Sequence, residues 1–278
     1  MISDKSIFFD YCFNENDVNK ACEKMLDNRV EGIVYHPLTW PAGETISSLA
    51  TFRYLKDIPI FVSASPEIFP VNSKSPHNWP LNSDCGKIFA KSIFYKLDRP
   101  NLWSTGAPED SDYQEGLADF FTICKLVANI KKSKVAVIGN ILDDFPESFY
   151  NPMTVRREIG SKVVEIDSSV LFILFETGSY PARGLSIDES QGKKYIDNLK
   201  KDLKINVEEK ILNKATRAYL AYKSLIESIG ADAAIFRCTP EWVEKYEIVV
   251  CGVMAELVDN GVIKSGGCEG DVLNTISG

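Results

Sequence analysis

The chain of 278 residues is predicted to be an α/β protein made of two tandem, doubly wound (Rossmann-like) parallel-sheet domains. Three observations predict this fold class. Strand-like and helix-like segments alternate along the sequence, and the strand-like segments are short continuous apolar runs, as in strands buried on both faces. The length also exceeds that of a typical single domain. We place the domain boundary near residue 105, so that residues 1–105 form the first domain and residues 106–278 the second.

The first domain contains one strand–helix–strand unit, which is typical of a parallel sheet. Its expected elements are a helix at 17–29, a strand at 32–36, a helix at 43–55, a strand at 59–63 and a helical segment at 85–96. Residues 64–112 are rich in Pro, Asn, Ser and Asp, and we expect turns to dominate there.

The alternation resumes in the second domain. Its expected elements are a helix at 113–130, a strand at 134–139, a helix at 153–159, a strand at 162–166, two helices within 194–230, a strand at 233–237 and one long helix at 241–260. Gly160 is the expected C-cap of the helix at 153–159. Asn206 separates the paired helices and is the expected N-cap of the later one.

Composition and charge exclude several classes of function. The net charge is −8 and the 31 Lys and Arg residues are spread along the chain, so we predict no nucleic-acid partner. The most apolar run, residues 170–175, is about a third of the length of a membrane span, so we predict no membrane partner. The first residues lack the basic start and unbroken apolar stretch of a signal peptide, which predicts a cytoplasmic protein.

Cysteine and histidine counts limit the chemistry further. The seven cysteines are scattered and form no CxxC pair, which predicts reduced thiols. The chain has two histidines, His36 and His77. Few imidazoles are therefore available for a histidine-rich metal site or for a Ser–His–Asp triad. No glycine-rich nucleotide-binding fingerprint is present, so dehydrogenase and kinase interpretations are discounted.

Ligands of open parallel sheets bind at the carboxyl ends of the strands, where four polar segments lie. The segment Gly266–Asp271 carries Glu269 and Asp271 between glycines, and such carboxylates bind Mg²⁺ or Mn²⁺ and can move protons. From chemistry alone, an ordinary acidic loop is the favoured interpretation of this segment. The other three segments are residues 36–44, 139–144 and 237–241.

Three further side chains in these segments have both a functional and a structural interpretation. Trp40 lies in a turn between prolines, where it could stack on a sugar ring or pack under its own loop. Arg237 and Glu241 could contact substrate hydroxyls, although an ion pair between them across a strand–helix turn is favoured. His36 ends a strand and is interpreted as a hydrogen-bonded structural histidine.

Four segments together resemble the L-fucose/L-arabinose isomerase-like family in order and spacing. Residues 266–272 (GGCEGDV) resemble its glycine-flanked CEGD segment, and residues 236–241 (FRCTPE), followed by a helix and DNGV, resemble the stretch before it. Residues 35–44 (YHPLTWPAGE) resemble its first-domain turn, and residues 134–139 its second-domain opening strand. The resemblance covers most of the chain.

This resemblance implies a metal-dependent aldose–ketose isomerase that works through an ene-diol. By position, Glu269 would be a metal ligand, with Mn²⁺ as the typical ion, and one catalytic acid/base. Asp271 would support that loop from behind, and Arg237 and Glu241 would line the sugar pocket. Trp40 would reach substrate in a neighbouring subunit of a homo-oligomer, a trimer or hexamer.

The sequence also departs from the family pattern. The family's second acidic ligand and its histidine ligand lie downstream of CEGD, whereas this sequence reaches only Gly278. We therefore expect an incomplete chain that is not competent alone. The alternative is a non-catalytic α/β protein that binds a small sugar.

Overall fold

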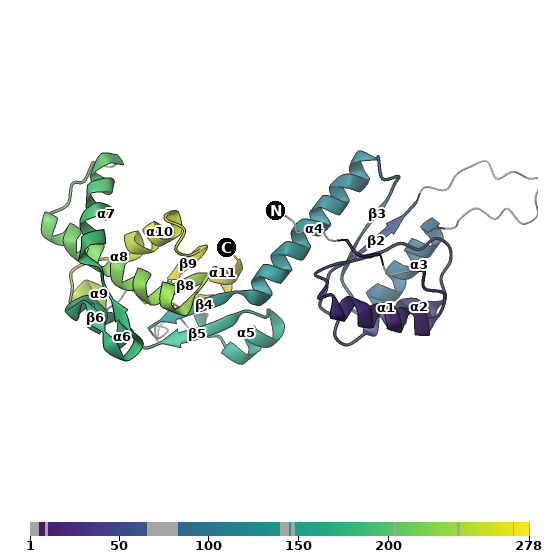
Figure 1. Cartoon of the computed structure of the whole chain (residues 1–278), viewed down its shortest axis with the longest axis horizontal. Coiled ribbons are helices and arrows are strands. Elements are labelled where there is room, and N and C mark those ends of the chain that lie inside the picture. Colours follow the sequence, from purple (N-terminus) through teal and green to yellow (C-terminus); the bar gives the residue numbers. More distant parts are fainter. Residues whose placement is uncertain are drawn as a thin grey trace, which may run out of the picture. The chain divides into compact units, whose positions relative to one another are not determined.

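The computed structural model describes residues 6–8, 11–65, 83–139, 145, 148–202, 204–237, 240–268 and 270–277, and it confirms the predicted fold class (Figure 1). Parallel sheets are flanked by helices in each of two compact units, residues 1–128 and 129–278. The division falls inside helix α4 (Ser111–Lys132), whereas the boundary predicted near residue 105 lies just before this helix.

The first unit is built on a parallel sheet with the strand order β1-β2-β3. Its elements besides α4 are α1 (Glu15–Asp27), β1 (Ile33–Tyr35), α2 (Gly43–Thr51), β2 (Ile60–Ala64), α3 (Ser83–Lys96) and β3 (Asn101–Thr105). In the central strand, Ile60 pairs with Ile33 on one side and with Asn101 on the other.

Helices cover the first sheet because alternate residues of β2 are apolar on both faces. Ile60 and Val62 pack in one core with residues of α1, α2 and α3, such as Phe94. Phe61 points to the opposite face, where it packs against Phe120 and Cys124 of α4. Each of the three β2 side chains is 0% exposed, as a doubly covered strand requires.

Two features of the first unit differ from the sequence-based prediction. Strand β3 was not predicted, since its sequence NLWST lies in the turn-rich region and forms an edge strand with alternating partial exposure. Helix α2 ends at Thr51 instead of residue 55. Buried Arg99 explains this end, because its Nη2 donates to the carbonyls of Leu55 at 2.6 Å and Ile58 at 2.5 Å, and so satisfies a non-helical turn.

The second unit contains a parallel sheet with the strand order β5-β4-β8-β9 and a small hairpin, β6-β7. Its strands are β4 (Lys134–Ile138), β5 (Lys162–Ile166), β6 (Ser179–Tyr180), β7 (Leu185–Ser186), β8 (Ala233–Phe236) and β9 (Ser265–Cys268). Its helices are α5 (Pro152–Glu158), α6 (Ser168–Thr177), η2 (Pro181–Arg183), α7 (Glu189–Asp202), α8 (Glu209–Ile229), α9 (Glu241–Glu244), α10 (Cys251–Asp259) and α11 (Val272–Ser277).

Both faces of this second sheet are buried. On one face, Ile138 and Phe236 pack against α6, α8 and α10. On the other face, Val137 and Ile235 pack against α5 and α11. None of the helices in the described part of the chain combines the length and the apolar character that crossing a bilayer requires.

Three predictions for the second unit were wrong in detail. The helix predicted at 241–260 is interrupted, since α9 ends at Glu244 and Glu247 adopts a left-handed φ of 60° before α10 begins. Asn206 is not the N-cap of α8, because the cap position is Glu208, which makes no side-chain capping bond. Residues 266–268, interpreted as loop, belong to strand β9.

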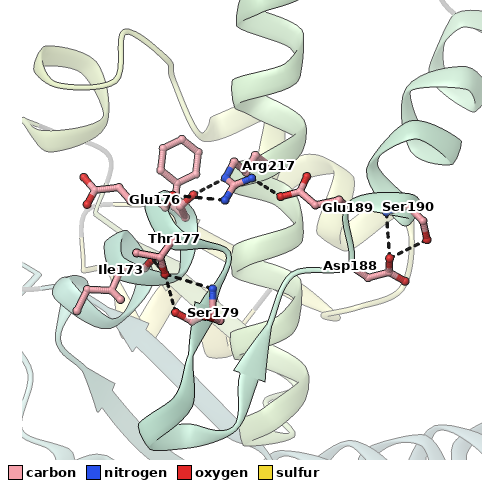
Figure 2. A network of polar contacts seen from close by, with 9 residues as sticks. Ile173, Glu176, Thr177, Ser179, Asp188, Glu189, Ser190 and Arg217 are labelled. Carbon is pink, nitrogen blue, oxygen red and sulfur yellow. Dashed lines mark hydrogen bonds and ion pairs between the residues drawn. The ribbon is translucent and has the colours of Figure 1, made fainter.

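Arg217 of α8 links the end of α6 to the start of α7 (Figure 2). Its guanidinium donates to the carbonyl of Phe175 near the end of α6 and pairs with Glu189 at the start of α7. Asp188 caps α7 by accepting from the Ser190 backbone N–H at 3.0 Å. The excursion between α6 and α8 is thus fixed by polar contacts to one long helix.

Helices pack closely against both faces of strand β9, which has glycines where they approach. A Cβ at Gly266 would lie 2.5 Å from Met254 Cγ of α10. A Cβ at Gly267, on the other face, would overlap the Thr275 hydroxyl of α11. The two glycines therefore set the distance between the strand and its helices.

We predict that Gly267→Ala lowers the free energy of unfolding by about 1–3 kcal/mol, the usual cost of overpacking. Urea unfolding followed by circular dichroism measures the change. Gly252→Ala is the matched control, because a Cβ at Gly252 of α10 meets no heavy atom within 4 Å. It should leave stability unchanged or raise it, as alanine favours helices. Equal stability of Gly267→Ala and the parent would contradict the close approach of α11.

Candidate functional sites at the sheet ends

Three strands of the second sheet end side by side. Ile138 of β4 pairs with Phe236 of β8, which pairs in turn with Cys268 of β9. Arg237 follows Phe236 directly, and its backbone N–H donates to the Ile138 carbonyl at 3.2 Å. Because ligands of parallel sheets gather at such an edge, this is the candidate site of the second unit.

Gly139 gives Arg237 its place at this edge. Gly139 has a φ of +96°, which side-chain-bearing residues rarely adopt, and its N–H donates to the Ile166 carbonyl at 2.9 Å. A Cβ at Gly139 would lie 2.9 Å from the Cβ of Arg237. The stem of Arg237 therefore lies against a bare backbone at the end of β4.

Arg237 and Glu241 are brought together as the favoured structural interpretation predicts. Arg237 Nε lies 3.5 Å from Glu241 Oε2, and the two side chains are 24% and 33% exposed. This long contact between partly exposed groups contributes at most about 1 kcal/mol. A guanidinium and a carboxylate are the donor and acceptor types that a polyhydroxylated ligand can use.

Asp271 caps the short helix α11. Its Oδ1 accepts from the Asn274 backbone N–H at 3.1 Å, and its Oδ2 accepts from the Asn274 side-chain amide at 2.6 Å. Its carbonyl accepts from the Thr275 hydroxyl at 2.7 Å. Asp271 thus holds the chain that follows the CEGD segment, while Glu269 itself lies outside the described residues.

The carboxylates near this edge have partners already, since Glu241 pairs with Arg237 and Asp271 caps a helix. Within the described ranges, no group of three or more His, Cys, Asp or Glu side chains could hold a metal ion. The described donor set therefore does not fit a metal by itself, and we derive no catalytic step through one.

The end of the first sheet is a hydrogen-bonded cluster around His36. Its Nδ1 lies 2.6 Å from Ser63 Oγ, and its Nε2 lies 3.1 Å from Ser65 Oγ. Ser83 of α3 donates to the Pro37 carbonyl at 2.5 Å and accepts from the Ser65 N–H at 3.1 Å. His36 is hydrogen-bonded, as predicted, and the cluster fixes the turn that leads to Trp40.

Trp40 is exposed on this turn. Its side chain is 64% exposed, and its ring meets Phe89 of α3 edge-on with the centroids 5.9 Å apart. Gly86 lets α3 approach the turn, because a Cβ there would lie 2.8 Å from Pro37 Cβ and would overlap the Thr39 carbonyl. Trp40 is therefore supported from one side and open to a ligand or a partner on the other.

Sequence reasoning missed a second polar group in the first unit. Asp84 and Lys87 of α3 meet Thr105 at the end of β3, and Lys91 lies over the ring of Trp103. The available signal was the spacing of Asp84, Lys87 and Lys91 on one helical face. This spacing alone did not indicate a site, because Trp103 and Thr105 of the unpredicted strand β3 supply the other side chains of the group.

The environment of His36 predicts a pH dependence of stability. Desolvation lowers the pKa of His36 from its ordinary value of 6.5, so the unfolded chain binds a proton more readily than the folded chain. The contribution to stability is complete above pH 6.5 and is lost as the pH falls toward the folded-state pKa. We expect a smaller loss between pH 7.5 and about pH 5.5 for His36→Gln than for the parent. Urea unfolding at both pH values measures the difference, and identical losses would contradict this prediction.

The capping role of Asp271 gives a second prediction. Asp271→Ala should lower the free energy of unfolding by about 1 kcal/mol, since the Asn274 N–H loses its acceptor. Asp271→Asn keeps an oxygen acceptor and should be close to the parent. Thermal unfolding of the three proteins decides, and equal destabilisation by Asn and Ala would refute capping as the role of this side chain.

Comparison with known proteins finds distant relatives. No family model matches the chain. It is 20% identical over 254 residues to the sulfoquinovose isomerase of Priestia aryabhattai and to that of Priestia megaterium (strain ATCC 12872 / QMB1551). The matched region covers 90% of this chain and 52% of each relative, so the chain spans about half the length of the curated relatives it matches.

Proposed function

We propose that this chain forms the two α/β domains of a metal-dependent aldose–ketose isomerase of the L-fucose/L-arabinose isomerase-like group. The similarity to two sulfoquinovose isomerases over 90% of the chain is the observation that carries the proposal. Sulfoquinovose is a hexose with a sulfonate group, so these relatives act on a sugar. The two-unit parallel-sheet fold with polar side chains at the strand ends suits a small-molecule substrate.

The edge of the second sheet is the proposed sugar pocket. Arg237 presents N–H donors and Glu241 presents carboxylate acceptors, and sugar hydroxyls can bond to both. Asp271 holds the start of α11 and so supports the segment that carries Glu269. We assign no further contact to Asp271.

Glu269 is the proposed catalytic residue. Conversion of an aldose to a ketose moves a proton between two neighbouring carbons, and a carboxylate can take it from one and return it to the other. Mn²⁺ or another divalent ion is the proposed cofactor, with Glu269 as one ligand. It would polarise the sugar oxygens during the transfer. The other ligands would have to lie outside the described residues, because these contain no group of three candidate ligands.

Trp40 is the proposed sugar contact of the first unit. Its exposed indole can stack on the apolar face of a sugar ring. In the proposed assembly, a cytoplasmic homo-oligomer with three or six subunits, Trp40 reaches the pocket of a neighbouring subunit. A sedimentation measurement of the purified protein tests the assembly, and a stable monomer would contradict it.

The decisive experiment uses the natural polypeptide that carries this sequence. Its coding sequence and intact mass establish its length, and ¹³C NMR follows ketose formation from sulfoquinovose and from neutral aldoses with Mn²⁺. We expect a ketose product, and we expect Glu269→Gln to reduce the rate at least about 100-fold, the size of a general acid–base contribution.

Glu244→Gln is the matched control, because Glu244 is an exposed carboxylate on α9. It should retain the parental rate and the parental affinity for Mn²⁺ in a calorimetric titration. Saturable sugar binding that is indifferent to a chelator, without any ketose, would replace the isomerase by a sugar-binding protein. Equal loss in both variants would refute the role of Glu269.

A further inference from the structure

One face of helix α3 carries an unusual group of charges. Asp84, Lys87 and Lys91 follow one another at intervals of three and four residues, so they lie on the same side of the helix. That side meets Trp103 and Thr105 of strand β3. Asp84 and Thr105 lie near the start of the helix and the end of the strand, whereas Lys91 and Trp103 lie near the middle of these two elements.

Lys87 is a buried cation in this group. Its residue is 6% exposed, and its ammonium lies 2.6 Å from Asp84 Oδ1 and also donates to the Thr105 hydroxyl. Thr105 donates to the same Asp84 oxygen at 3.0 Å. The two partners take two of the three N–H donors of the ammonium, which leaves one to be satisfied.

Lys91 is a second cation on the same aromatic ring. Its ammonium lies 3.5 Å from the centroid of Trp103, and that of Lys87 lies 5.0 Å from the same centroid. Desolvation and the charge of Lys87 lower the pKa of Lys91. Trp103 is 53% exposed and Lys91 is half-buried, so the ring and the Lys91 ammonium lie at a surface that solvent reaches, whereas Lys87 is buried.

The charges in this group do not balance. Two ammonium groups repel each other at short range, and among the residues that the structure describes Asp84 pairs with Lys87. An anion that accepts from the Lys91 ammonium would offset this repulsion, with the charge of the buried Lys87 close by. A tetrahedral oxyanion has three oxygens free for such bonds when it is attached to carbon through the fourth position.

We propose that Lys87, Lys91 and Trp103 form a binding site for the sulfonate or phosphate group of an anionic sugar. The sugar part of this assignment rests on the proposed function, whereas the anion part rests on the geometry of the lysine pair. Lysine binds such groups as a point charge. Thr105 positions Lys87 and is not assigned a contact with the ligand.

Calorimetric titration of the purified chain tests the site with four probes: sulfoquinovose, glucose 6-phosphate, glucose and inorganic sulfate. We expect both anionic sugars to bind at least about tenfold more tightly than glucose, as a charge-assisted hydrogen bond to an anion predicts. Lys91→Gln should abolish this preference. Lys96→Gln, which removes the same charge from the last turn of the same helix, should keep it.

Lys87→Gln is a second variant, and its thermal unfolding is measured alongside because it leaves Asp84 without its ion-pair partner. Folded Lys87→Gln protein should also lose the preference. An equal affinity for anionic and neutral sugars would overturn the proposal. A preference that survives Lys91→Gln would overturn it too, since the anion would then bind elsewhere.

The remaining outcomes separate this inference from the proposed function. Sulfate that binds as tightly as the anionic sugars would refute the sugar-borne ligand and leave a site for free oxyanions. A lysine-dependent preference without ketose formation by the natural polypeptide would support the anion site and contradict the isomerase. Ketose formation from neutral and anionic aldoses alike, unaffected by Lys91→Gln, would support the isomerase and contradict the anion site.

Discussion

The parallel pairing of strands is the constraint on which both units depend. A parallel pair cannot be closed by a short hairpin, so each strand must be followed by a crossover that returns the chain to the same end. These crossovers are helices, and they bury both faces of the sheet. Strand β8 shows the result, because all of its residues are buried between two helical layers. The same constraint places the carboxyl ends of all strands of a sheet at one edge, where polar side chains can meet.

The polar side chains at the carboxyl edges of the two sheets find their hydrogen-bond partners in different ways. In the first unit, hydroxyls of Ser63 and Ser65 satisfy the ring of His36, and the turn after it is held rigidly. In the second unit, Arg237 and Glu241 form an ion pair with an Nε–Oε2 distance of 3.5 Å between partly exposed groups. The first arrangement fixes a turn that carries the exposed Trp40, and the second leaves charged groups at the surface of the strand ends.

Much of the fold could be predicted from the sequence wherever the burial of a segment is reflected in its local composition. Strands β4 and β5 were found to within one residue, because both are short valine-rich runs. The central strand β4 is buried on both faces, and the edge strand β5 is partly exposed. Strands β3 and β9 were missed for opposite reasons. Strand β3 is a partly exposed edge strand, and β9 contains two glycines, which favour loops in isolation. The contacts of Gly266 and Gly267 with α10 and α11 are tertiary and leave no local trace.

The candidate sites, too, could be predicted in part from local sequence and in part only from the tertiary structure. The rule that ligands bind at the carboxyl ends of parallel strands was enough to select Trp40, Arg237, Glu241 and Asp271 from the sequence. The capping role of Asp271 needed the beginning of α11, and the break after α9 needed the left-handed Glu247. The lysine pair on α3 could not be recognised, since its meaning depends on Trp103 of the missed strand.

Strand β9 also has an evolutionary consequence. At two successive positions, Gly266 and Gly267, any larger residue must displace a side chain of the helix that lies against that face. Sequence drift in this strand would displace a helix before it could alter a ligand contact. Sequence variation in this unit is therefore expected first in the segments beyond the strand ends, where the partly exposed Arg237 and Glu241 lie.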